Sequence, residues 1–341
     1  MQYLKTKITD MLGIEHPIVQ DGMGPFNTVK LAAAVSNAGG MGTVSMPTMS
    51  GDPDWARKTL REHIKTVAGM TDKPFAVNVG VGIDKTTKQM VPVCAAMIET
   101  VIEAANDKSI GGTLTALTTS GGFPGPFVDD IKASPLVHIQ KVGATRQALK
   151  AQEAGADALF ASGYEMGGHT HMKPVHTFVL GPNVTEAVNI PVMISGGVKD
   201  ARGLVAALAM GAEGVGMGTR FIAADANDWC EEYKQRIVES KEGDDTLVPM
   251  WFSVARALKG PGIDKLMALV DEGKMSGEEL GEYKTAALTA AQRDADFETG
   301  IVACGQVATG IHDIVNVAEF VPAMAKEAAE IIQKQNAFVA S

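Results

Sequence analysis

Short apolar runs alternate with longer amphipathic segments over the first two-thirds of the chain. The runs are apolar throughout, which is typical of strands buried on both faces of a parallel sheet. Helical periodicity lies between them, at 29–38, 54–67, 93–105, 145–154 and 201–210. Eight such units over about 225 residues predict an α/β fold, a TIM (β/α)8 barrel, which usually needs ~250 residues. The eight predicted strands start near Ile18, Met41, Phe75, Leu114, Val137, Asp157, Pro191 and Glu213.

The pattern changes near residue 227. Helical segments are predicted at 228–240, 263–271, 277–289 and 317–333, and we find no strand candidates between them. We therefore expect two parts: a barrel at 1–225, and a helical region at 226–341 that packs on or near the barrel mouth.

Glycine is unusually frequent, with 37 of 341 residues, against a usual share of ~7%. Many glycines directly follow the predicted strands. Ordinary tight turns explain any one of them, but active sites of barrels lie at the carboxyl ends of the strands. The set therefore indicates a ligand site; its members are Gly22, Gly24, Gly121, Gly122, Gly163, Gly167, Gly168, Gly196, Gly197 and Gly218.

The last two strands carry the sharpest signal. Gly196 and Gly197 follow the seventh strand, and Gly218 and Thr219 follow the eighth, before a short helical turn. Bare main-chain amides and a helix N-terminus can converge on phosphate oxygens, and the Thr219 hydroxyl is a further donor. Loops after strands 7 and 8 are the common phosphate site of barrels. We predict a phosphate there, with two ordinary turns as the alternative.

A histidine follows the sixth strand, in GYEMGGHTH. His169 suits proton transfer or hydrogen bonding to a developing charge, because histidine titrates near neutral pH. A surface-loop histidine is one alternative, and a zinc site with His171 and His176 is another. Metal sites need further ligands at other strand ends, and these loops offer no convincing set, so no metal is expected.

Other predicted strand ends carry polar or small residues. Asn78 is a donor to a heterocycle or a cap of the following turn. Lys141 is a charged donor to a ligand ring, a Schiff-base former or an exposed lysine. Gly22 and Met23 fit along a flat ligand, although core packing explains Met23 equally well.

Charge and cysteine content narrow the function classes. Lys and Arg number 30 and Asp and Glu 40, for a net charge of −10, which argues against nucleic acid or an anionic membrane as partner. The three cysteines are odd in number and far apart in sequence. This pattern gives no disulfide framework and suits a protein of a reducing cytoplasm. The chain shows neither an apolar run of ~18 residues nor a signal-peptide core. We expect a soluble, cytoplasmic protein.

Several motifs of the chain resemble the nitronate monooxygenase family, formerly called 2-nitropropane dioxygenases. These are FMN-dependent TIM barrels related to FabK-type enoyl-acyl-carrier-protein reductases and to NADH:quinone reductases. SGG and MGTRF also occur in other FMN or phosphate barrels, and EMGGH makes the resemblance specific. The matching segments are LGIEHPIVQDGMG, LAAAVSNAGGMGTVS, DKPFAVNV, GADALFASGYEMGGH, PVMISGGVKDARGLVAALAMGAEGVGMGTRF and, less closely, GQVATGI.

The resemblance implies a role for each candidate residue. It implies that the FMN phosphate is held by Gly196, Gly197, Gly218 and Thr219. It further implies that Asn78 and Lys141 touch the isoalloxazine or ribityl part, that Gly22 and Met23 lie against the ring, that Gly167 borders it, and that His169 is the active-site histidine. The chain departs from the family at Ser162 and Gly216, where monooxygenases usually carry glutamine.

The implied activity is oxidation of alkyl nitronates with O2 to a carbonyl compound and nitrite. The alternative is NAD(P)H-dependent reduction of quinones or enoyl thioesters. No GxGxxG fingerprint is present, so NADH or NADPH is expected to bind only transiently. Two further hypotheses are a flavin-free barrel enzyme acting on a sugar phosphate through Lys141, and a non-catalytic sensor of a phosphorylated ligand. The expected partner is a small-molecule substrate, and a homodimer is compatible with the sequence.

Overall fold

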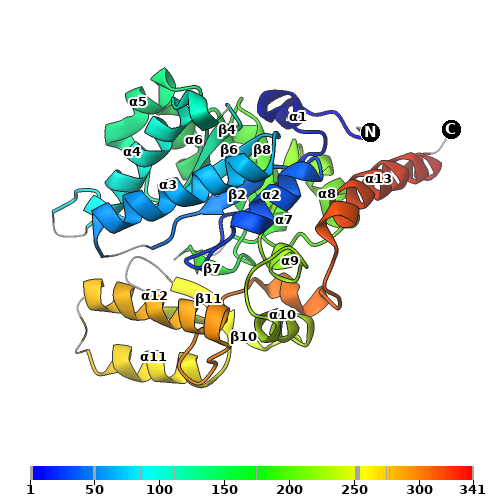
Figure 1. Cartoon of the computed structure of the whole chain (residues 1–341). Coiled ribbons are helices and arrows are strands. Elements are labelled where there is room, and N and C mark those ends of the chain that lie inside the picture. Colours follow the sequence, from blue (N-terminus) through cyan, green and yellow to red (C-terminus); the bar gives the residue numbers. More distant parts are fainter. Residues whose placement is uncertain are drawn as a thin grey trace.

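The computed structural model describes residues 3–48, 51–84, 87–110, 112–171, 173, 175–249, 254–273, 275 and 277–339. Within these residues, eight parallel strands form one sheet in the order β1-β9-β8-β6-β5-β4-β3-β2. A parallel bridge between Val19 and Met41 joins the two ends of this order. The predicted TIM barrel is confirmed (Figure 1). The strands are β1 (Ile18–Gln20), β2 (Gly42–Ser45), β3 (Phe75–Val81), β4 (Leu114–Gly121), β5 (Val137–Val142), β6 (Ala158–Ser162), β8 (Val192–Ser195) and β9 (Gly214–Met217).

Helices surround the sheet because each one buries a single apolar face against it. In α3 that face is made by Ala56, Leu60, Ile64 and Val67, which are three or four residues apart. All five helical segments predicted for this part of the chain are present. The helices are α2 (Val29–Asn37), α3 (Pro53–Met70), α4 (Pro92–Ala105), α5 (Val128–Ala133), α6 (Thr145–Glu153), α7 (Thr177–Ala187), α8 (Ala201–Ala209) and α9 (Thr219–Ile222), with short 3-10 turns at Lys108–Ile110 and Gly125–Phe127.

The barrel interior is a packed apolar core rather than a channel. Val19, Ile139, Phe160 and Met193 meet there from four different strands. The amino-terminal helix α1 (Lys7–Leu12) contributes Ile8 and Leu12 to the same cluster. One end of the barrel is thus filled, which leaves the carboxyl ends of the strands for a ligand.

The expectation that no strand follows residue 227 is wrong. Strands β10 (Asp245–Pro249) and β11 (Val254–Leu258) pair antiparallel, and β11 also pairs with β7 (Gly168–Thr170). The reason lies in Arg256, a charged residue in the middle of β11 that is buried and paired with Asp245. A charge at a buried strand position hides the apolar pattern from which strands are predicted.

The four helices predicted for the carboxyl-terminal part are present. They are α10 (Glu231–Val238), α11 (Pro261–Asp271), α12 (Gly277–Asp294) and α13 (Val317–Gln335), with 3-10 turns at Gln306–Gly310 and Asn336–Phe338. Figure 1 shows α11 and α12 with β10 and β11 as a small lobe beside β7. Helix α13 lies elsewhere, on the outside of the barrel against α2 and α8. No helix among the described residues is long and apolar enough to cross a membrane.

Candidate active site

A cavity of about 960 Å³ lies at the carboxyl ends of the barrel strands. Its volume is at the upper end of the range for small-ligand and cofactor sites. Residues of β11, α12 and segment 301–307 line the side that faces away from the barrel. The structure brings all ten predicted site residues to this one cavity: Gly22, Met23, Asn78, Lys141, Gly167, His169, Gly196, Gly197, Gly218 and Thr219.

The turn after β8 requires glycine and is bare toward the cavity. Gly196 and Gly197 have φ values of 92° and 84°, a region that other residues rarely adopt. A Cβ atom on Gly196 would lie 3.0 Å from the carbonyl oxygen of Gly163, whereas one on Gly197 would meet nothing within 4 Å. The main chain at Gly197 therefore borders open space, where an anionic group can approach it closely.

The turn after β9 adds a hydroxyl to the same region. Gly218 is the N-cap of α9, and Thr219 is the first residue of that helix. The Thr219 Oγ1 accepts a hydrogen bond of 2.9 Å from the main-chain N–H of Gly305. Because this bond uses the oxygen as acceptor, the hydroxyl proton is left to be donated to a ligand. A Cβ on Gly218 would be no closer than 3.7 Å to its neighbours.

The loop between β6 and β7 packs on a segment far along the chain. A Cβ on Gly167 would lie 2.4 Å from the carbonyl carbon of Cys304, which is closer than real Cβ contacts. The N–H of Gln306 donates to the carbonyl of Glu165 at 2.9 Å. Gly167 thus has a packing reason to be glycine, independent of any ligand.

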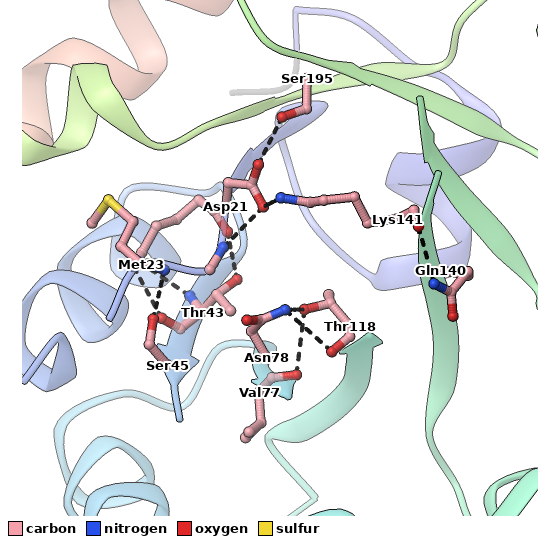
Figure 2. Close-up of polar contacts among 12 residues, drawn as sticks. Asp21, Met23, Thr43, Ser45, Val77, Asn78, Thr118, Gln140, Lys141 and Ser195 are labelled. Carbon is pink, nitrogen blue, oxygen red and sulfur yellow. Dashed lines mark hydrogen bonds and ion pairs between the residues drawn. The ribbon is translucent and has the colours of Figure 1, made fainter. Parts of the chain in front are cut away.

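A charged network crosses the floor of the cavity (Figure 2). Lys141, near the end of β5, forms an ion pair with the Asp21 carboxylate, and both side chains are about one-tenth exposed. The second carboxylate oxygen of Asp21 accepts a 2.7 Å hydrogen bond from Ser195 Oγ. The Gly22 N–H donates to Asp21 Oδ1 at 2.9 Å. Lys141 is therefore a held cation at the cavity wall and not a freely exposed lysine.

Asn78 lies in the middle of β3 rather than at its end, because the strand runs on to Val81. Its Nδ2 donates to Thr118 Oγ1 at 2.9 Å and to the Thr118 carbonyl at 3.3 Å. Its side chain also packs on Gly22, where a Cβ would lie 2.3 Å from Asn78 Oδ1. The Asn78 amide is thus fixed by β4, with its face against Gly22.

Met23 lines the cavity and is also part of the packed core. Its N–H donates to Ser45 Oγ at 2.7 Å, and its side chain is buried in the core cluster beside β9. It also lies against Gly218: a Cβ added there would be 3.7 Å from the Met23 Cγ. Met23 therefore connects the cavity lining with the packed core.

His169 lies in β7, opposite Ala255 of β11. Lys284 of α12 reaches it, with Nζ 2.8 Å from Nδ1 and 2.9 Å from Nε2. Burial, with a smaller contribution from the Lys284 charge, lowers the pKa of His169 well below its usual value. Burial lowers the pKa of Lys284 from 10.5 to about 7. The two groups therefore do not both carry a positive charge at neutral pH.

Lys284 is a site residue that the sequence reasoning missed. Its signal was present, because Lys284 lies four residues after Leu280 and four before Leu288, on the apolar face of a predicted helix. A lysine on the apolar face of a helix is expected to be buried, and its ammonium group then needs a polar neighbour such as a cavity. In the structure it is nine-tenths buried and borders the cavity.

His171 and His176, the two other histidines of the zinc alternative, contact different groups. The imidazole of His171 packs on Gly143, and the exposed His176 lies 3.3 Å from a carboxylate oxygen of Glu165. Burial, together with the charge of Lys141, lowers the pKa of His171. Among the described residues, no three histidine, cysteine or carboxylate side chains gather as metal ligands would.

Known proteins share both the sequence and the fold. One relative, from Rhodococcus jostii (strain RHA1), is named "(3aS,4S,5R,7aS)-5-hydroxy-7a-methyl-1-oxo-octahydro-1H-indene-4-carboxyl-CoA dehydrogenase". It is 36% identical over 65% of this chain. The match covers 56% of its own length, so the chain spans little more than half of that relative. A "Probable nitronate monooxygenase" of Staphylococcus saprophyticus is 32% identical over 79% of this chain and 82% of its own.

Among solved structures, FabK from Thermotoga maritima is 34% identical, with a TM-score of 0.85 over 98% of this chain and 100% of its own. The names of the two relatives above, a dehydrogenase and a probable monooxygenase, are those of oxidoreductases. The family description of nitronate monooxygenases matches residues 5–327. The chain is thus an enzyme of the oxidoreductase type and belongs to the nitronate monooxygenase family.

Proposed function

We propose that the cavity holds FMN and that the protein is an FMN-dependent oxidoreductase. The observation that carries this proposal is a single cavity that joins two bare glycine turns to His169. In this proposal the phosphate binds at Gly196, Gly197 and Gly218, and the Thr219 hydroxyl donates to it. Both turns have room for a ligand, since a Cβ on Gly197 would meet nothing within 4 Å and one on Gly218 would make only ordinary contacts at 3.7 Å or more. When bound, FMN supplies the electron transfer, and the protein supplies position and charge.

The flavin ring is proposed to lie over the floor of the cavity. Lys141 offers it a charged donor that Asp21 and Ser195 hold in place. Asn78, Gly22 and Met23 line the adjoining wall, and Gly167 borders the ring from the loop before β7. Lys141 and Asn78 lie within barrel strands, and Gly22 and Met23 follow β1 closely, which suits the orientation of a planar group.

We propose oxidation of alkyl nitronates with O2 to a carbonyl compound and nitrite as the reaction. His169 then hydrogen-bonds the nitronate oxygens, or takes a proton from the neutral nitroalkane. Its lowered pKa keeps the imidazole neutral and so able to accept a proton at physiological pH. The similarity to a probable nitronate monooxygenase supports this choice.

A second candidate is reduction of enoyl thioesters with NADH or NADPH. The likeness to FabK favours it, since it extends over nearly the whole chain at 34% identity. The surroundings of Gly216 agree with this candidate. A Cβ on Gly216 would lie 2.6 Å from Phe160 Cε1, so the glutamine usual in monooxygenases has no room there.

Parallel assays of one preparation test both candidates. We expect the purified protein to be yellow, with FMN released on denaturation. O2 uptake and nitrite release with propyl-2-nitronate support the first reaction. Anaerobic oxidation of NADH or NADPH that depends on crotonyl-CoA, or on a quinone, supports the second. A colourless protein in which borohydride traps Lys141 with a sugar phosphate would refute the flavin proposal, as would bound FMN that exchanges electrons with none of these donors.

A further inference from the structure

Lys284 is held at the cavity by the packing of the small lobe. Its neighbours on α12, Ala287 and Leu288, pack in one cluster with Val248 and Ala255 of the β10–β11 pair. Ala255 is in turn the strand partner of His169. The lysine and the histidine are therefore fixed to one rigid unit, and their 2.8 Å separation follows from how that unit packs.

We propose that Lys284 and His169 together bind a negatively charged oxygen of the substrate, with Lys284 supplying the positive charge and His169 a second hydrogen bond. This inference rests on the proposed function, because the oxygen it concerns belongs to the substrate of the flavin. It adds Lys284 to that function as a residue that contacts the substrate. It also requires the substrate to present an oxygen that carries or gains negative charge.

The physical reason is the cost of two charges in one place. Two cations less than 3 Å apart, away from bulk water, repel each other strongly. Near neutral pH the pair therefore carries at most one positive charge, that is, at most one proton beyond its neutral state. An anionic oxygen stabilises that proton, so binding of the anion and protonation of the pair favour each other.

Other charged side chains also border the cavity, among them Arg146 and Lys173. Lys141 is paired with Asp21, and Arg256 of β11 is paired with Asp245. Glu165 accepts hydrogen bonds from the Thr177 N–H and hydroxyl. His171 also borders the cavity, and its pKa is lowered by burial and by Lys141. Burial brings the pKa of Lys284 to about 7, so its charge changes near neutral pH.

Both candidate substrates offer such an oxygen. A nitronate carries the negative charge before it reacts, so loss of Lys284 is expected to raise KM. A thioester carbonyl gains negative charge only as it reacts, so the same loss is expected to lower kcat and leave KM almost unchanged. The Lys284→Met variant, assayed with propyl-2-nitronate and with crotonyl-CoA plus NADH or NADPH, distinguishes these two sources of the anionic oxygen.

The direct test compares an anion with its neutral isostere. Calorimetric titration of the purified holoprotein with propionate and propionamide at pH 6 and pH 9 measures the preference for charge. We expect propionate to bind at least tenfold more tightly than propionamide at pH 6, and the preference to disappear at pH 9. Lys284→Met is expected to remove it at both values. Lys265→Met, at an exposed lysine of α11, is the matched control and leaves it unchanged.

A second variant keeps the test decisive if Lys284→Met does not fold. His169→Asn removes the second hydrogen bond but leaves Lys284, whose pKa is lowered by burial, so the preference for propionate at pH 6 is expected to weaken but to persist, and to disappear at pH 9. Nitrogen NMR of 15N-histidine-labelled protein gives a further readout, with the His169 signal assigned by its loss in His169→Asn. Lys284→Gln is expected to move the titration of His169 to higher pH.

A folded Lys284→Met protein that keeps the full preference for propionate would overturn the proposal. The same holds if Lys284→Gln leaves the pH at which His169 titrates unchanged. Calorimetry and NMR do not depend on flavin colour or on turnover. A colourless protein that still prefers propionate would therefore refute the flavin assignment but not the anion site. A yellow protein without that preference would refute the anion site alone.

Discussion

Lys141 Nζ lies 2.5 Å from Asp21 Oδ1, although 120 residues separate the two in sequence. The pair joins the end of β5 to the end of β1 across the cavity floor, and Ser195 of β8 adds a hydrogen bond to the same carboxylate. Three strand ends are thus connected through one buried carboxylate. This network sets the charge of the floor on which the flavin is proposed to lie.

Removing one partner of this pair is expected to be costly. Lys141→Met leaves the Asp21 carboxylate buried without its counter-charge, and loss of one partner of a buried pair costs about 3–5 kcal/mol of unfolding free energy. Denaturant unfolding followed by circular dichroism measures the loss. The double variant Lys141→Met with Asp21→Asn removes both charges and should recover part of it. A double variant as unstable as the sum of the two single ones would contradict the coupling.

Gly218→Val tests the phosphate site without disturbing the fold. The nearest atom to a Cβ there is Met23 Cγ at 3.7 Å, an ordinary contact. The added methyl groups then occupy space next to the α9 N-terminus. We expect a folded protein with little or no FMN, measured as the ratio of flavin to protein absorbance, and a smaller effect for Gly218→Ala. Full flavin occupancy in the valine variant would place the phosphate elsewhere.

Gly167→Ala is expected to act on stability. The new Cβ would lie 2.4 Å from the Cys304 carbonyl carbon, so the main chain must move. Overpacking of this kind costs about 1–3 kcal/mol, which thermal unfolding detects as a lower Tm. Gly69→Ala is the control, because Gly69 lies inside α3 with open space around it. There alanine should stabilise the helix by roughly 0.5–1 kcal/mol.

His169→Ala separates cofactor binding from turnover. The histidine borders the cavity from β7, whereas the proposed phosphate site lies on the loops after β8 and β9. We expect the variant to keep its FMN and its Tm but to lose at least tenfold in kcat/KM. General acid–base groups contribute about 10²–10⁴-fold. Loss of FMN in this variant would mean that the histidine holds the cofactor instead.

Stability is expected to depend on pH through Lys284. Burial lowers its pKa from 10.5 to about 7, so between these values the unfolded chain binds more protons than the folded one. The free energy of unfolding then rises with pH across this window, by at most about 1.4 kcal/mol per pH unit. Lys284→Met removes the rise and stabilises most at pH 7 and below. Urea unfolding of both proteins at pH 6.5, 8 and 9.5 checks this, and parallel pH profiles would contradict it.

The barrel could be predicted because its strands and helices have local signatures. The run from Phe75 is apolar through its first three residues, and Gly196 and Gly197 stand where a strand must turn into a helix. Such patterns depend only on neighbours in sequence. The end of β3 was harder to predict, because the polar Asn78 looks like a strand end in the sequence. In the structure Asn78 is buried and donates a hydrogen bond to Thr118, so the strand continues past it.

The small lobe could not be predicted in the same way. Arg256 is acceptable in β11 because Asp245, on the neighbouring strand β10, and the Tyr164 carbonyl, 92 residues away in sequence, bind its guanidinium. Likewise, the closeness of Lys284 and His169 follows from the pairing of β7 with β11 and from the packing of α12. Neither contact has a signature that a single segment carries.

The pairing of β7 with β11 divides the cavity between two parts of the chain. The glycine turns after β8 and β9 belong to the barrel, whereas Ala255, Lys284 and Leu288 form the opposite wall. Substitutions in β11 and α12 can therefore change the side of the cavity where the substrate is proposed to bind, while the glycine turns stay as they are. A family built this way is able to diversify its chemistry by exchanging one wall and inheriting the other.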